Sequence, residues 1–94
     1  MAVFVVEWTY AVDRAGREAV NAEHKAHLKD LAERGILLAG GPLPQDNTGL
    51  LVYRAKDRAA LAELFADDPY VQAGYVKQSL IREWQVNFGT LTGA

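Results

Sequence analysis

Residues 3–10 are all apolar, aromatic or β-branched except Glu7. Alternate residues of an extended chain point to opposite faces, so the run divides into two sets. One face carries Phe4, Val6, Trp8 and Tyr10, and the other carries Val3, Val5, Glu7 and Thr9. A strand that is largely apolar on both faces needs cover from both sides. The run therefore predicts a strand inside a layered structure.

Two helices are predicted from their capping signals. Asp13 is expected to cap a helix that runs to about Arg34, where Gly35 supplies a left-handed stop. Asp57 is expected to cap a shorter helix that runs to Ala66. The Asp-Asp-Pro sequence at 67–69 ends this helix because the residue before proline disfavours helical geometry, and residues 70–74 form one further turn.

Three more strands complete the pattern, at residues 36–39, 50–54 and 79–88. We expect Gly40, Gly41 and Pro42 to form a tight turn after the second strand. The order strand, helix, strand, strand, helix, strand is typical of the ferredoxin-like α+β fold, with both helices on one face of an antiparallel four-stranded sheet. A second copy of the chain is the simplest cover for the other face, which predicts a homodimeric α+β barrel.

Composition restricts the function. The 94 residues, half of them apolar, suit one domain, residues 1–94. Twelve acidic and ten basic residues are dispersed along the chain, so no basic stripe offers a nucleic-acid surface. The absence of cysteine excludes thiol chemistry on the protein. No segment suits a membrane span or a leader peptide, which leads us to expect a cytoplasmic protein.

His24 and His27 are the residues with the most chemical potential. Helical spacing places both on the inward stripe of the first predicted helix, together with Val20, Leu28 and Leu31. Three interpretations remain open: both rings are satisfied by hydrogen bonds near the core, they hold a metal ion, or one of them transfers protons. A catalytic metal would need a third ligand, such as Asp67 or Asp68, and no cluster of such ligands is evident.

Asp68 is the best candidate partner for His24. The second helix is expected to lie antiparallel to the first, so that the turn at its end brings a carboxylate against the first helix. An aspartate bound to one imidazole nitrogen fixes the tautomer and makes the other nitrogen a better base.

Other residues, including His27, are candidates for substrate contacts. The backbone of Gly41 and Pro42 can approach a ligand closely, but its context does not fit a phosphate-binding loop. Tyr70 belongs to a set of aromatic residues that can pack in the core or line a pocket. Arg82 interrupts an apolar strand face, where it can pair with an acid across a dimer or hold a substrate carboxylate.

Four segments together resemble the YCII-related (YciI-like) proteins. They are His24-Lys-Ala-His-Leu-Lys-Asp-Leu-Ala-Glu-Arg-Gly, Leu37-Leu-Ala-Gly-Gly-Pro-Leu, Asp68-Pro-Tyr-Val-Gln-Ala-Gly and Ile81-Arg-Glu-Trp. The resemblance implies a ferredoxin-like protomer of a dimeric α+β barrel, with a pocket that holds a His and Asp pair at His24 and Asp68. Many members have arginine where this chain has Asn21, so an anion contact at that position would have to come from Arg17 instead.

The resemblance also implies chemistry on small cyclic or aromatic compounds. It favours a cofactor-free lyase or isomerase in which His24 moves a proton and Asp68 orients it, as in dehydrochlorination of a chlorinated hydroxyquinol or in muconolactone isomerisation. The alternative is a non-catalytic dimeric protein that binds a small molecule and uses the same pair as a structural hydrogen bond.

Overall fold

The computed structural model describes all 94 residues. Four strands and three helices follow one another, with a short 3₁₀ turn (Ala15–Arg17) before the first helix. Their bounds are β1 (Ala2–Tyr10), α1 (Glu18–Glu33), β2 (Leu37–Leu43), β3 (Thr48–Ala55), α2 (Arg58–Ala66), α3 (Pro69–Gln72) and β4 (Val76–Glu83).

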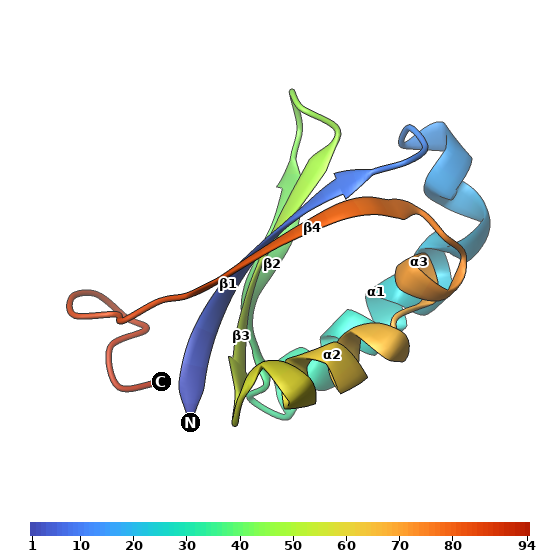
Figure 1. Cartoon of the computed structure of the whole chain (residues 1–94). Helices are drawn as coiled ribbons and strands as arrows, with labels where there is room; N and C mark the ends of the chain where they lie inside the picture. The colour runs from blue at the N-terminus through green and yellow to red at the C-terminus, as the bar shows by residue number, and fades with distance from the viewer.

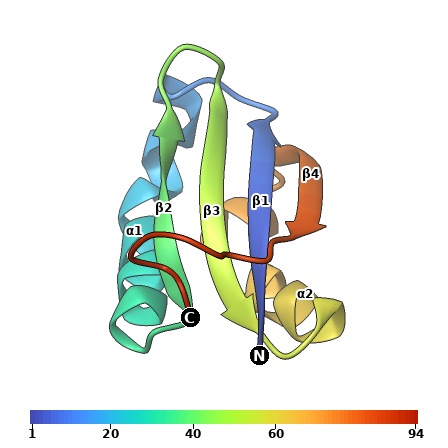
Figure 2. The same ribbon diagram turned by 90° about the vertical axis from the view of Figure 1, so that its left-hand side faces the viewer.

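The four strands form one antiparallel sheet in the order β2-β3-β1-β4. All the helices lie on one side of this sheet, and the other side is free of helices (Figures 1 and 2). The ferredoxin-like α+β fold expected from the sequence is therefore confirmed. β1 lies inside the sheet between β3 and β4.

The predicted ends of the helices agree with local hydrogen bonds. Gly35 has φ +73°, and the amide of Ile36 donates to the carbonyl of Leu31, which ends α1. Asp57 accepts a hydrogen bond from the amide of Ala60 and begins α2. Asp13 differs from the prediction, because its carboxylate accepts from the amide of Gly16 within the 3₁₀ turn, and α1 begins only at Glu18.

The expected tight turn at Gly40, Gly41 and Pro42 is wrong, because these residues lie inside β2. β2 is an edge strand, where proline is tolerated because only one side of the strand needs hydrogen bonds. The chain reverses after Leu43 instead, near Asn47, whose φ of +50° is a left-handed turn conformation.

The last strand was predicted to begin three residues too late and to end five residues too late. β4 spans Val76–Glu83, and its final bond to β1 runs from the amide of Trp84 to the carbonyl of Val3. β1 begins at Ala2, so residues beyond Trp84 have no neighbouring strand to pair with. The alternation of apolar residues therefore continues through residues 84–88, but these residues are not part of the sheet.

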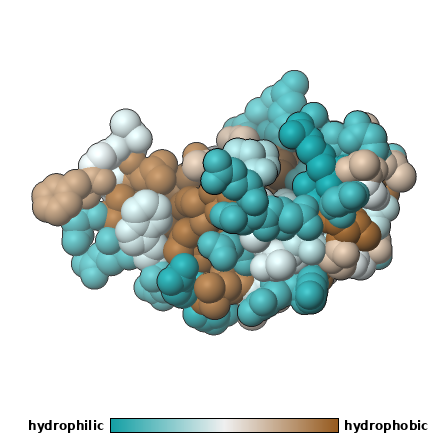
Figure 3. Space-filling model, turned by 90° about the horizontal axis from the view of Figure 1, so that it is seen from above, coloured by the Kyte–Doolittle hydropathy of each residue, from teal (hydrophilic) through white to brown (hydrophobic).

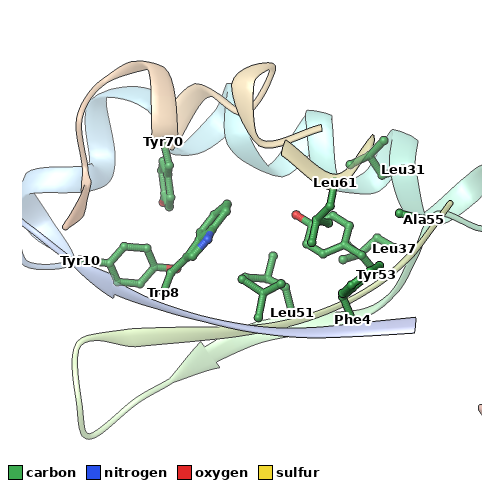
Figure 4. Packing of buried hydrophobic residues seen from close by; sticks show 11 residues of the cluster. Phe4, Trp8, Tyr10, Leu31, Leu37, Leu51, Tyr53, Ala55, Leu61 and Tyr70 are labelled. Atoms are coloured by element: carbon green, nitrogen blue, oxygen red, sulfur yellow. The ribbon is translucent and has the colours of Figure 1, made fainter. Parts of the chain in front are cut away.

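The core lies between the sheet and the helices (Figure 4). Trp8 and Tyr53 from the sheet meet Leu31 of α1 and Leu61 of α2, and all four side chains are fully buried. Phe65 contacts both Trp8 and Tyr53 with ring edges, at centroid distances of 5.4 and 5.5 Å. These contacts fix α2 on the sheet, and α2 leads directly into the site described below.

The helix-free face of the sheet carries the second apolar set of β1. Val5 pairs there with Val52 of β3 and with Arg82 of β4. The C-terminal segment crosses this side of the sheet (Figure 2), and hydrophobic atoms gather on the same side in the view from above (Figure 3). Phe88 in this segment is 92% exposed. None of the helices is long and apolar enough to cross a membrane.

Candidate active site

His24 and Asp68 are brought together where α3 packs against α1. Nδ1 of His24 on α1 lies 2.8 Å from Oδ1 of Asp68, which is the residue before α3. The two residues are 44 positions apart in the sequence. His24 is 8% exposed and Asp68 is fully buried. A carboxylate only accepts hydrogen bonds, so the shared proton belongs to Nδ1 and Nε2 is the nitrogen left with a free lone pair.

Asp68 is placed by its local sequence. Its Oδ1 also accepts a hydrogen bond of 2.9 Å from the amide of Tyr70, and Pro69 occupies the first position of α3. Aspartate before proline is a standard way to begin a helix. Oδ2 of Asp68 is buried without a hydrogen-bond partner. One oxygen thus caps α3 and holds His24 at the same time.

The ring of Tyr70 fixes the orientation of the His24 imidazole. The two rings are stacked, with centroids 3.6 Å apart and planes 4° apart. The hydroxyl of Tyr70 donates to Oδ1 of Asn21 at 2.8 Å, which ties α3 to α1. Tyr70 points from α3 toward Tyr10 and Trp8 of β1 (Figure 4). His24 therefore has a fixed tautomer and a fixed ring plane.

A cavity of about 300 Å³ opens beside this pair, and His24 lines it. This volume is at the lower end of the range for small-molecule sites. Three residues predicted to contact a substrate also line the cavity, namely Gly41, Pro42 and Tyr70. The correction to β2 explains the position of the first two, because the extended strand carries them along the cavity wall. The remaining lining residues include Tyr10, Arg14, Arg17, Glu18, Asn21, Lys25 and Gly49.

The other two predicted substrate contacts do not line the cavity. Arg82 pairs in register with Val5, so it lies on the helix-free face of the sheet, and it is exposed. His27 is half-buried on α1, and its Nε2 is buried without a hydrogen-bond partner. No three His, Asp or Glu side chains converge in the structure as a metal site would require.

Arg17 and Tyr10 are cavity residues to which sequence reasoning gave little weight. The guanidinium carbon of Arg17 lies 3.9 Å from the centroid of the Tyr10 ring. Arg17 is seven residues before His24, a spacing of about two helical turns that returns to the same face, and this signal was present in the sequence. Tyr10 was placed only on one face of the first predicted strand.

The tyrosines of the site keep their protons to high pH. Burial raises the pKa of Tyr70, and the neighbouring Arg17 partly opposes this rise. Burial likewise raises the pKa of Tyr10, again against the charge of Arg17. Both hydroxyls are therefore hydrogen-bond donors at neutral pH and not bases.

Comparison with solved structures finds the same fold in other proteins. The fold is similar to that of 5-chloro-2-hydroxyhydroquinone dehydrochlorinase (TftG) from Burkholderia phenoliruptrix AC1100, solved in complex with 2,5-dihydroxybenzoquinone. The TM-score is 0.76 at 18% sequence identity, and the match covers 96% of this chain and 98% of the other. No curated protein sequence matches the chain.

The model of the YCII-related domain matches residues 3–85. This range includes every strand and helix apart from the first residue of β1, and it includes both His24 and Asp68. The resemblance drawn from the four sequence segments is thereby confirmed: the chain belongs to the YCII-related domain family.

Proposed function

We propose that the protein is a cofactor-independent lyase or isomerase that acts on a small cyclic or phenolic molecule. The observation that carries this proposal is the 2.8 Å contact between His24 and Asp68 at the wall of a cavity. In this arrangement Nε2 of His24 takes a proton from the substrate, and Asp68 holds the ring and stabilises the resulting imidazolium. Proton transfer of this kind contributes about 10² to 10⁴ in rate.

The structural relative suggests a substrate class. TftG is a dehydrochlorinase of a chlorinated hydroxyhydroquinone. Loss of HCl transfers one proton to the base while the bonding pair of the C–Cl bond leaves with chloride, so no external oxidant or reductant is needed. A His and Asp pair without a cofactor is sufficient for such a step when the substrate proton is already acidic. Gly41, Pro42 and Tyr70 would contact the ring of the substrate.

The test is turnover of a panel of small ring compounds that includes 5-chloro-2-hydroxyhydroquinone, with chloride release as the readout. We expect His24→Gln to keep the fold and to lower turnover by about 10² to 10⁴. His27→Gln is the matched variant on the same helix and should retain turnover, since His27 lies outside the cavity. Equal turnover by His24→Gln and the wild type would refute the proposal.

A non-catalytic binding role is the second candidate, and one observation favours it. Asp68 is fully buried and caps α3, so the pair also has a structural role. This alternative predicts that no compound in the panel is converted and that His24→Gln lowers the melting temperature markedly. If the wild type bound a compound of the panel without converting it, this result would support the binding role.

We also propose that two copies of the chain pack through their helix-free sheet faces. Val5, Leu50 and Leu80 lie on this face, and Leu80 is 43% exposed although it is apolar. Packing a second sheet there would remove this apolar area from water without changing the cavity, which lies on the helix side.

A further inference from the structure

The stack between His24 and Tyr70 has a geometry that two neutral rings avoid. The ring centroids are 3.6 Å apart and the planes differ by 4°. Stacked carbon atoms touch at about 3.5 Å, so the two rings lie almost directly over one another. Neutral aromatic rings prefer an offset or an edge contact, because both faces are negative. The aromatic pairs of the core follow this preference, since Phe65 meets Trp8 and Tyr53 edge-on, at 71° and 68°.

A proton on His24 turns this contact from unfavourable to favourable. The negative face of a phenol ring attracts a cation that lies within about 6 Å of the ring centroid. At 3.6 Å, the imidazolium of His24 lies well inside this range. Trp8 is the other aromatic ring beside His24, but its centroid is 6.4 Å away and its plane is tilted by 46°. Tyr70 is therefore the ring that can stabilise a positive charge on His24.

The charged groups around His24 leave this role to Tyr70 and Asp68. Asp68 accepts the hydrogen bond of Nδ1 and favours the charged form of the ring. The hydroxyl of Tyr70 donates to Oδ1 of Asn21, and burial raises the pKa of Tyr70, so its ring is a neutral phenol in the pH range where histidines titrate. The other charged side chains at the cavity wall form no ion pair with His24, and they are Arg14, Arg17, Glu18 and Lys25.

We propose that Tyr70 is a positioning residue that acts through His24, because its ring stabilises the imidazolium that forms when Nε2 takes a proton. Asp68 binds one edge of the imidazole at Nδ1 and Tyr70 covers one face, while His24 still lines the cavity. The new charge thus meets a carboxylate and a negative ring face that are already in place. This role is distinct from a substrate contact of Tyr70. The inference depends on the proposed function only for the use of His24 as a base.

The experiment follows the imidazole nitrogens of both histidines by NMR as the pH is changed, without any ligand. The variants are Tyr70→Phe and the same variant with one or with three fluorine atoms on the phenylalanine ring. Fluorine withdraws electrons from the ring face and hardly changes the shape of the ring, so the stack remains while its attraction for a cation weakens. We expect the pH midpoint of His24 protonation to fall stepwise along this series, by about 0.5 to 1 pH unit in total.

His27 is the internal control, since it lies on the same helix outside the cavity. Its midpoint should stay constant, and His24→Gln and His27→Gln assign the two sets of signals. If the loss of the hydroxyl prevents folding, 3-fluorotyrosine at position 70 keeps the hydrogen bond to Asn21 and should also lower the His24 midpoint. A His24 midpoint that stays constant or rises along the series, or a parallel shift of His27, would overturn the proposal.

The measurement needs no substrate, so the two proposals can fail separately. A stepwise fall of the His24 midpoint supports the role of Tyr70 even if no compound of the panel is converted, and that absence of conversion would count against the proposed function alone. If a compound is converted, the acidic limb of its kcat/KM profile should shift along the series by the same amount as the NMR midpoint.

Discussion

Two aspartates begin helices in this protein, and they differ in what else they touch. Asp57 is exposed and caps α2 only, whereas Asp68 is fully buried and holds both the amide of Tyr70 and the ring of His24. An exposed cap contributes about 1 kcal/mol to stability. A buried acceptor with two donors contributes more, because its removal leaves those donors unsatisfied.

This difference gives a prediction for a matched pair of variants. Asp57→Ala should lower the free energy of unfolding by about 1 kcal/mol, and Asp68→Ala should lower it by about 2 to 5 kcal/mol. Urea denaturation followed by circular dichroism measures both. Similar losses for the two variants would show that the His24 contact of Asp68 adds no stability.

The buried tyrosines predict a loss of stability at alkaline pH. Burial raises the pKa of Tyr53 far above its usual value, and the charge of Asp68 adds to this rise. Above about pH 10 the unfolded chain loses the proton of this tyrosine while the folded chain retains it. The unfolded state then binds fewer protons, so stability present below pH 10 falls as the pH rises, by about 1.4 kcal/mol per pH unit for this group.

Tyrosinate absorbance and urea denaturation at several alkaline pH values measure this effect. Tyr53→Phe keeps the ring in the core and removes the titrating group, so its stability should fall less steeply with pH than that of the wild type. Parallel curves for the two proteins would contradict the assignment.

At the scale of elements, β3 needs a glycine where it lies next to Tyr10 of β1 at the cavity wall. A Cβ on Gly49 would collide with the hydroxyl of Tyr10, and the Tyr10 ring lies in turn beneath the guanidinium of Arg17. The absent side chain of Gly49 thus makes room for the Tyr10 ring that lies against Arg17. Gly41 also lines the cavity, but a Cβ there would contact nothing.

The same substitution should therefore have a different effect on stability at the two glycines. Gly49→Ala should lower stability by about 1 to 3 kcal/mol, because buried Tyr10 has to move. Gly41→Ala should change stability by about 0.5 kcal/mol or less. Thermal unfolding of both variants measures these changes in stability. If Gly49→Ala left the stability unchanged, Tyr10 would be free to shift.

At the scale of the whole molecule, the helices cover one face of the sheet and leave the other free of helices. If two copies meet there, Leu80→Glu should shift the protein toward the monomer, since a charge would be buried in an apolar contact. Ala59→Glu adds the same charge to an exposed position of α2 on the helical side. Sedimentation analysis of both variants measures the effect. A monomeric wild type, or equal dimer content in both variants, would argue against this interface.

The elements and their order could be predicted from the sequence alone. Local signals sufficed for β1, for the glycine stop at Gly35 and for the cap at Asp57, since each depends on neighbours a few residues away. The ends of the strands were less predictable. The extension of β2 through Pro42 and the end of β4 at Glu83 depend on which strand lies alongside, and no local signal carries that information.

The candidate site divides in the same way. The His24 and Asp68 pair was predictable, because antiparallel helices on one sheet face bring the turn before α3 against α1. Only the tertiary structure separated His24 from His27, placed Arg82 on the far face of the sheet and left Arg17 buried without an acid. Residue type and helical spacing fix the face on which a side chain lies. The contacts and the countercharge it finds there depend on segments far away in the chain.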